Sequence, residues 1–217
     1  MTPQPIMETR KNSGSSHGVV YLLRHGVIET QAGGRRFIGW QDTMLNETGH
    51  GQARAWAEYF SGKGLEAIYS SDLSRCLETA RIIGARCFLE PEAFSALREI
   101  RLGQWEGRRF KTIQKLHPQA FQKRGDDIGN YRPPGGESFR DLQERVWPVF
   151  ETIVRQVSNR ILIVTHAGVI RVLLCRILGM PLENLFRIGQ AYGALNIVDV
   201  MQESCRLQAV NHPPPGK

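Results

Sequence analysis

Three short apolar runs, each followed by a helical pattern, constrain the fold of this chain more than any other feature of its sequence. The runs span residues 19–23, 67–69 and 161–164. None of them alternates apolar with polar residues, which is typical of parallel strands that are buried on both faces. The alternation of strand and helix signals predicts an α/β fold, a three-layer α/β/α sandwich with a mostly parallel central sheet.

Capping residues indicate where the helices of the outer layers begin. We expect Asp72 to cap the helix that follows the second run, and Asn46 or Thr48 to open an earlier helix. Ser138 is expected to begin a long helix, because Asp141 stands three residues later in the position of a capping-box partner.

The length of 217 residues suits one domain with a sizeable core. We assign that domain to residues 18–211, with flexible tails at 1–17 and 212–217, because Pro and Gly gather at both ends of the chain. The sequence leaves open whether the chain forms a homodimer.

The apolar window 161–180 is too interrupted for a membrane span, because it contains His166, Arg171 and Arg176. The four cysteines are scattered and form no CxxC pair. This spacing argues against a zinc site and against a disulfide framework, and it indicates reduced thiols in the cytoplasm. We therefore expect no metal and no other cofactor.

The formal net charge of +7 favours anionic partners. Nucleic acid is not expected, because the chain has neither a recognition motif nor an interleaved aromatic platform. A basic run contains a single acid, Glu106, and is either a solvated helical face or a lid that draws anionic substrates inward. Its members are Arg101, Arg108, Arg109, Lys111, Lys115, Lys123 and Arg124. Phe110 and Phe121, in the same run, could pack against a nucleoside ring or against the core.

Cationic and ionisable side chains follow all three predicted strands. Arg24 and His25 end the first run, Arg75 follows the second, and His166 follows the third. Because ligands of open α/β sheets bind beyond the carboxyl ends of the strands, these four side chains should meet in one cleft. Their positive charges repel one another, and a bound anion removes that conflict. Arginine forks suit phosphate in particular.

The motifs at these strand ends resemble those of the histidine phosphatase superfamily, also called phosphoglycerate mutase-like. The motifs are LRHG at 23–26, SSDLSRCLETA at 70–80 and THAG at 165–168, with LREI at 97–100, GQWEG at 103–107 and PGGES at 134–138 between the last two. The resemblance runs from about residue 19 to about residue 210, in the order of the family, and implies the phosphoglycerate mutase-like fold.

The resemblance implies a role for each site residue. His25 is the nucleophile that forms a phosphohistidine, Arg24 and Arg75 grip phosphate oxygens, and His166 stabilises the charge that builds up during transfer. Glu99 is the general acid and base, with Glu106 as the competing carboxylate. Substrate contacts are expected at Gln31, where the family usually has Asn, and at Gly39 and Ala167.

The physical chemistry of imidazole agrees with the role of His25. A histidine is a nucleophile only while it is unprotonated, and the neighbouring Arg24 and Arg75 disfavour its cationic form. Gly26 lets the backbone come close and hold the ring in one orientation.

Within the family, hydrolysis of a small-molecule phosphomonoester without a metal is favoured over phosphoglycerate mutase activity, because the extra segment that closes the mutase pocket is absent. The LGMP stretch at 178–181, with Gln190 and Gly193, resembles alpha-ribazole phosphatases, which act on alpha-ribazole 5′-phosphate in cobalamin biosynthesis. Broad-specificity sugar or acid phosphatases share these strings. A non-catalytic protein that binds a phosphate ligand is the alternative from another class.

Overall fold

The computed structural model describes residues 18–29, 34–201 and 204–216, and shows a central sheet of six strands. In chain order these are β1 (Gly18–Arg24), β2 (Leu65–Ser71), β3 (Glu92–Phe94), β4 (Arg160–Thr165), β5 (Leu195–Met201) and β6 (Ser204–His212). Their order across the sheet is β3-β2-β4-β1-β5-β6. The pairs among β3, β2, β4 and β1 are parallel, whereas β5 pairs antiparallel with β1 and with β6. The predicted mostly parallel sheet is confirmed.

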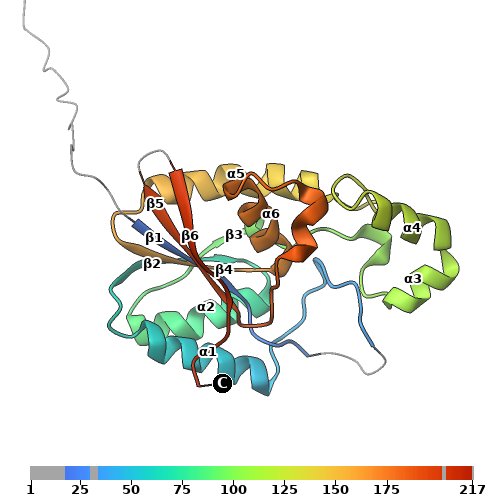
Figure 1. The fold of residues 1–217 in the computed structure, drawn as a ribbon. Coiled ribbons are helices and arrows are strands. Elements are labelled where there is room, and N and C mark those ends of the chain that lie inside the picture. Colours follow the sequence, from blue (N-terminus) through green and yellow to red (C-terminus); the bar gives the residue numbers. More distant parts are fainter. Residues whose placement is uncertain (1–17, 30–33, 202–203, 217) are drawn as a thin grey trace, which may run out of the picture.

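Two pairs of helices cover the faces of this sheet (Figure 1). Helices α1 (Glu47–Phe60) and α2 (Ser74–Cys87) lie on one face, and α5 (Phe139–Arg155) and α6 (Ala167–Ile177) lie on the other. Alternate residues of β1 divide between two buried clusters, with Tyr21 and Leu23 in the cluster of α1 and α2, and Val20 and Leu22 in the cluster of α5 and α6. The predicted three-layer sandwich is confirmed.

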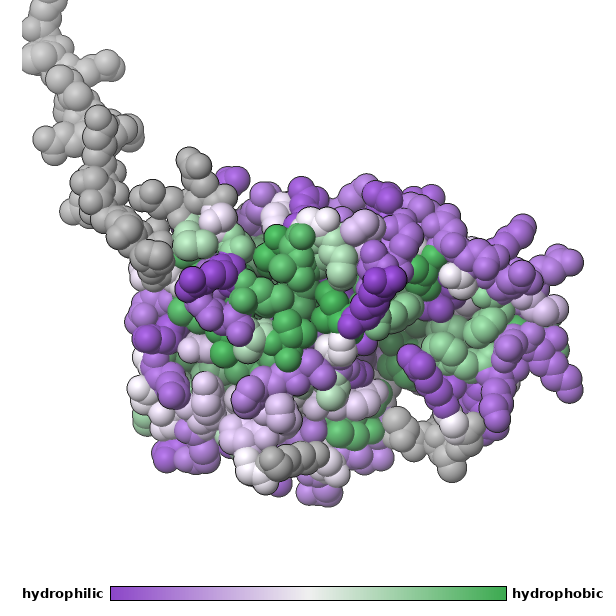
Figure 2. Space-filling model, in the orientation of Figure 1, coloured by the Kyte–Doolittle hydropathy of each residue, from purple (hydrophilic) through white to green (hydrophobic). Residues whose placement is uncertain are grey.

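A helical excursion projects from the side of the sandwich, at the carboxyl ends of the parallel strands. It contains α3 (Phe110–Leu116) and α4 (Pro118–Asp126), and 3-10 turns lie at η1 (Ser95–Leu97), η2 (Gly103–Trp105) and η3 (Leu182–Arg187). Hydrophilic side chains project from the outer edge of this excursion (Figure 2). No helix in the described part of the chain is both long enough and apolar enough to cross a bilayer.

The three apolar runs form β1, β2 and β4, as predicted, but β3, β5 and β6 were missed. β3 has only three residues, and β6 alternates between exposed and half-buried positions, so neither gives a continuous apolar run. The predicted C-terminal tail needs correction, because β6 continues to His212 and Pro214 is buried. The predicted N-terminal tail lies outside the described residues.

The predicted caps are correct in two cases and wrong in one. The Asn46 side chain accepts from the Gly49 N–H at 2.9 Å and begins α1, and Ser138 and Asp141 form the reciprocal capping box of α5. Asp72 caps no helix, because both its carboxylate oxygens accept from Arg98, at 2.7 and 2.6 Å. The first turn of α2 is bonded instead by Asp42, whose carboxylate accepts from the backbone N–H and the hydroxyl of Ser74.

Candidate active site

The ends of β1 and β4 bring the two motif histidines together. The strands pair in parallel with Arg24 opposite Thr165, and the His25 N–H donates to the Thr165 carbonyl at 3.0 Å. The rings of His25 and His166 consequently lie 5.2 Å apart, centroid to centroid, in an edge-to-face arrangement. Both side chains are buried. The predicted meeting of these strand-end residues is confirmed, whereas their chemical roles remain predictions.

The backbone around His25 fixes the orientation and the tautomer of its ring. Nδ1 lies 2.8 Å from the Gly26 carbonyl, which can only accept, so Nδ1 carries the proton and Nε2 keeps its lone pair. A Cβ on Gly26 would lie 2.6 Å from the carbonyl oxygen of Gly49, which shows why this position needs a glycine. Burial, and then the charges of Arg75 and Arg24, hold the pKa of His25 well below its usual range. His25 is therefore a neutral imidazole with an available nucleophilic nitrogen.

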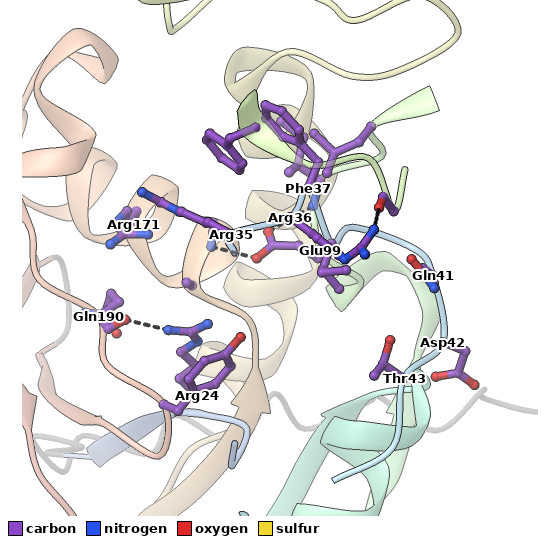
Figure 3. A pocket seen from close by; sticks show the side chains of 18 of the residues that line it. Arg24, Arg35, Arg36, Phe37, Gln41, Asp42, Thr43, Glu99, Arg171 and Gln190 are labelled. Atoms are coloured by element: carbon purple, nitrogen blue, oxygen red, sulfur yellow. Dashed lines mark hydrogen bonds between the residues drawn. The ribbon is translucent and has the colours of Figure 1, made fainter. Parts of the chain in front are cut away.

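Arg24 and Arg75 flank this imidazole and keep unused hydrogen-bond capacity. Arg24 donates through Nη1 to the Gln190 carbonyl at 2.6 Å, and its guanidinium stacks on the ring of Tyr192 at 3.6 Å from the centroid (Figure 3). Arg75 donates to the carbonyls of Gln41 and Gly39, at 2.8 and 2.6 Å. The Nε of each arginine is buried and has no hydrogen-bond partner among the described residues. Buried donors are normally satisfied, so these two Nε–H groups are donors that an anionic ligand could use.

His166 lies behind this group, at the start of α6. Its Nε2 is hydrogen bonded to the Ser71 hydroxyl at 2.9 Å, and the Cys76 sulfur is 3.4 Å from the same nitrogen. Burial is the largest cause that keeps the pKa of His166 well below its usual range, followed by the charge of Arg75. His166 is therefore neutral as well, and it would act as a hydrogen-bonding group rather than as a cation.

Glu99 and Glu106, the two competing carboxylates, occupy different environments. Glu99 lines the cavity beside Arg24, and its carboxylate accepts from the N–H groups of Ile100 and Gly168 at 2.9 and 3.0 Å (Figure 3). The Glu106 carboxylate accepts from four backbone N–H groups, those of Gly39, Trp40, Gln41 and Leu102. Glu106 thus anchors a loop, whereas Glu99 faces the site.

Three other side chains hold the Glu99 segment in place by binding its backbone carbonyls. Trp40 Nε1 donates to the Glu99 carbonyl at 2.7 Å, and Arg145 donates to the carbonyls of Ala96, Arg98 and Glu99. The Thr165 hydroxyl donates to the Leu97 carbonyl at 2.9 Å and ties the segment to β4. The carboxylate is therefore fixed relative to the strand ends.

A cavity of about 1050 Å³ opens in front of these residues. Arg24, Glu99 and Ala167 line it, as do residues of the loop that follows β1 and Arg124 of α4. His25, Arg75 and His166 are not among the lining residues and lie just behind them, almost fully buried. Of the four strand-end residues, only Arg24 therefore lines this cavity, and the other three are buried.

The predicted substrate contacts do not all lie at the cavity. Ala167 lines the cavity. Gly39 does not, because its N–H donates to Glu106 and its carbonyl accepts from Arg75, so it supports the arginine from behind. Gln31 lies outside the described residues. Phe110 lines the cavity and stacks on Phe37 with 3.8 Å between centroids, whereas Phe121 contacts Phe110 and packs against the core.

The cavity residues missed at the level of sequence include two arginines and a tyrosine. Arg35 belongs to the loop after β1, Arg171 lies on α6, and Tyr192 supports Arg24. Helical spacing could have found Arg171, since it stands four residues after Ala167 and so shares a helix face with it. Arg35 and Tyr192 lie in segments without regular periodicity and give no such signal.

The donor chemistry of the site suits an anion. Within residues 18–29, 34–201 and 204–216, no group of three or more His, Cys, Asp or Glu side chains could hold a metal ion. The inner site consists of Arg24, His25, Arg75 and His166. Its positive charge comes from the two arginines, with backbone N–H groups at the start of α6 nearby.

Comparisons with known proteins agree with the motifs and the geometry. A sequence profile of the histidine phosphatase superfamily (branch 1) matches residues 20–213. The glucosyl-3-phosphoglycerate phosphatase of Mycolicibacterium vanbaalenii is 34% identical over 171 residues, which are 75% of each chain. The 6-phosphofructo-2-kinase/fructose-2,6-bisphosphatase of Gallus gallus is 34% identical over 168 residues, which are 76% of this chain and 34% of that protein, about a third of its length.

A solved structure shows the same likeness in three dimensions. The alpha-ribazole phosphatase from Shigella flexneri superposes with a TM-score of 0.80 at 26% identity, covering 89% of this chain and 96% of the other. The strand-end motifs, the arrangement of His25, Arg24, Arg75, His166 and Glu99, the matched profile and this shared fold all agree. The chain therefore belongs to the histidine phosphatase superfamily, branch 1, and has the phosphoglycerate mutase-like fold.

Proposed function

We propose that this chain hydrolyses a small-molecule phosphomonoester, without a metal, through a phosphohistidine on His25. One observation carries the proposal: a neutral, oriented imidazole lies between two guanidinium groups, each with a buried Nε–H that has no partner among the described residues. A phosphoryl group next to Nε2 would accept from those donors. Transfer would then proceed with the charge on the equatorial oxygens already stabilised.

The first step transfers the phosphoryl group to the enzyme. The Nε2 lone pair of His25 attacks phosphorus while the bond from phosphorus to the ester oxygen breaks. Glu99, in its protonated form, gives its proton to that oxygen, so that an alcohol rather than an alkoxide leaves. His166 would donate a hydrogen bond to a phosphoryl oxygen.

The second step returns His25 to its starting form. A water molecule attacks the phosphorus atom of the phosphohistidine, and the Glu99 carboxylate takes one of the water protons. The bond between nitrogen and phosphorus breaks, its electron pair returns to Nε2, and inorganic phosphate leaves. Glu99 is again protonated, so acid and base alternate on one carboxyl group.

Two substrates are supported by the relatives. The likeness to the alpha-ribazole phosphatase of Shigella flexneri favours alpha-ribazole 5′-phosphate as the substrate. The resemblance of the LGMP stretch at 178–181 to alpha-ribazole phosphatases favours the same substrate. The glucosyl-3-phosphoglycerate phosphatase relative favours a phosphorylated sugar acid instead. A screen should measure phosphate release from both substrates, from simple sugar phosphates and from both phosphoglycerates. Interconversion of the two phosphoglycerates without net phosphate release would instead make the chain a mutase.

The nucleophile is tested with the His25→Ala variant. Brief exposure of the wild type to ³²P-labelled substrate should give a protein label that is stable in base and labile in acid. The variant should fold normally, as judged by circular dichroism, yet carry no label and release no phosphate. Label on the variant would identify another nucleophile. Absence of turnover by the wild type on every substrate and on p-nitrophenyl phosphate would favour a binding protein and overturn the proposal.

A further inference from the structure

The segment 190–194, between η3 and β5, holds Arg24 in place without a carboxylate. The Gln190 carbonyl accepts from Arg24 Nη1 at 2.6 Å (Figure 3), and the guanidinium lies over the Tyr192 ring, 3.6 Å from its centroid. Among the described residues, Arg24 takes part in no salt bridge. The position of Arg24 therefore depends on where this segment lies, and its charge is left for an anion.

Gln52, on α1, joins this segment to the loop that follows His25. Its Oε1 accepts from the Val27 N–H at 2.9 Å, and its Nε2 donates to the Tyr192 carbonyl at 3.1 Å. Because the backbone N–H can only donate and the carbonyl can only accept, the amide has one satisfied orientation. The two ends of one buried amide thus bind the loop after His25 and the segment that holds Arg24.

Trp56 adds a second link from the same face of α1. It stands four residues after Gln52, and its Nε1 donates to the Gly193 carbonyl at 2.7 Å. The Gly193 N–H in turn donates to the His25 carbonyl at 3.0 Å. A Cβ on Gly193 would lie 3.0 Å from Gln52 Cδ and 3.1 Å from Pro214 Cγ, so the segment is tightly enclosed.

Two more amide side chains hold the beginning of the segment. Gln190 and Asn196, both buried, exchange two hydrogen bonds at 2.7 and 3.0 Å. Asn196 also donates to the carbonyl of Leu22, two residues before Arg24 on β1, at 3.2 Å. The segment is therefore tied to the strand that carries Arg24 as well as to α1.

The absence of charge from this support suits the chemistry proposed for the inner site. A carboxylate beside Arg24 would compete with the phosphoryl group for the guanidinium, and it would favour the cationic form of His25. Carbonyls, an aromatic ring and amides orient the guanidinium without either effect. The amides of Gln52, Gln190 and Asn196 each have partners for their oxygen and their nitrogen, so the buried network is satisfied.

We propose that Gln52 is a positioning residue for the transfer step, and that its neutral amide sets Arg24 against His25. The proposal rests on the proposed function, because these two side chains are taken to act on one phosphoryl group. Gln52 is buried and is not among the residues that line the cavity, so it acts on the substrate only through them. Its loss should weaken the grip on the phosphoryl group whatever the rest of the substrate is.

The Gln52→Met variant tests this role, because methionine is close to glutamine in volume and bridges neither segment. We expect kcat/KM to fall about tenfold or more, as a small displacement of a catalytic group costs. The loss should be equal for p-nitrophenyl phosphate and glycerol 3-phosphate, since Arg24 binds the phosphoryl group and not the leaving group. Gln143→Met is the matched control and should keep wild-type rates. Gln143 is half-buried on α5, donates to the Val172 carbonyl at 2.8 Å and does not line the cavity.

Double variants show the route of the effect. If Gln52 acts through Arg24, Gln52→Met should cost no more than about twofold in an Arg24→Ala background, whereas it should keep its full cost in a Glu99→Gln background. General damage to the fold would multiply the loss in both backgrounds. Trp56→Phe removes the other link from α1 and keeps an aromatic ring. It should show the same coupling with a smaller loss, and it replaces Gln52→Met if that variant does not fold.

The Gln52→Glu variant tests whether the amide must be neutral. It has the shape of the wild-type side chain and keeps the acceptor for the Val27 N–H, so shape and bonding alone would make it the milder change. At about pH 8, where a carboxyl group is ionised, we expect it to be slower than Gln52→Met, because its charge competes for Arg24.

The outcomes separate the two proposals. Rates of Gln52→Met within twofold of the wild type, losses that multiply in the Arg24→Ala background, or a Gln52→Glu variant faster than Gln52→Met would overturn the positioning role of a neutral amide and leave the phosphatase intact. No turnover of any substrate by the wild type would overturn the proposed function. Calorimetric titration with orthovanadate would then decide the positioning role alone. The wild type should bind more tightly than Gln52→Met, and equal or absent binding would refute the role.

Discussion

Substitution of Gly168 by Ala should displace the carboxylate of Glu99, the proposed general acid and base, while leaving the fold intact. Gly168 is the second residue of α6, and a Cβ added there would lie 2.2 Å from Glu99 Oε1. Real Cβ contacts are essentially never shorter than 3.0 Å, so the carboxylate must move by about 1 Å. The displaced atom is the far end of a flexible side chain, which makes the movement cheap for the fold.

The cost should appear in catalysis. A displacement of about 1 Å can lower a rate by about 10²-fold, so we expect this loss in kcat/KM for an alkyl phosphate such as glycerol 3-phosphate. The loss corresponds to about 2.7 kcal/mol of transition-state stabilisation. Formation of the phosphoenzyme from p-nitrophenyl phosphate should suffer much less, because p-nitrophenolate leaves without a proton. Rapid-mix kinetics with both substrates gives the comparison.

Two further variants sharpen this test. Glu99→Gln should show the same dependence on the leaving group, with a loss of about 10²–10⁴-fold on the alkyl phosphate. The double variant should be no slower than Glu99→Gln alone, because the alanine acts only through Glu99. Gly51→Ala is the matched control, since Gly51 also lies in a helix and has open space around its Cβ position. It should keep full activity and gain about 0.5–1 kcal/mol of stability.

The reasoning would be refuted in either of two ways. Activity of Gly168→Ala within twofold of the wild type on the alkyl phosphate would mean that the position of Glu99 does not matter. Equal losses of rate on good and poor leaving groups would mean that the alanine disturbs the site by another route. A double variant whose loss of rate is the product of the two single losses would mean the same.

Three other predictions follow from the site. Glu106→Gln should lower the free energy of unfolding by about 1–3 kcal/mol, because a carboxylate that accepts four backbone N–H groups loses one acceptor oxygen. Any loss of rate in this variant should be equal for good and poor leaving groups. Unequal losses would mean that Glu106 takes part in proton transfer. The lowered pKa of His25 and His166 means that the unfolded chain takes up protons first, so stability should fall as the pH drops below about 6.5. Urea titration of the wild type and of His166→Asn should show a shallower pH dependence in the variant, and an unchanged slope would contradict the assignment. Activity should survive EDTA, because arginines supply the positive charge of the site; a large loss that one divalent ion restores would contradict that view.

The sequence alone determined the central half of the sheet and the identity of the inner site. Continuous apolar runs are a local signal, and they located β1, β2 and β4 because those strands are buried on both faces. His25 and His166 could be placed together for the same reason, since each directly follows one of those strands and parallel strands end at a common edge. Motif order then added Glu99, which no periodicity would have singled out.

Tertiary structure decided what depends on partners that are distant along the chain. Asp42 rather than Asp72 bonds the start of α2, because a cap needs only an acceptor in the right place and does not require it to be adjacent in sequence. Glu106 became an anchor and Glu99 the site carboxylate through contacts with residues more than sixty positions away. Arg35, Arg124 and Arg171 line one cavity only after a loop and two helices have packed together. Charges gathered in this way leave no pattern in the sequence, because the repulsion and burial that define them arise between elements and not within any one of them.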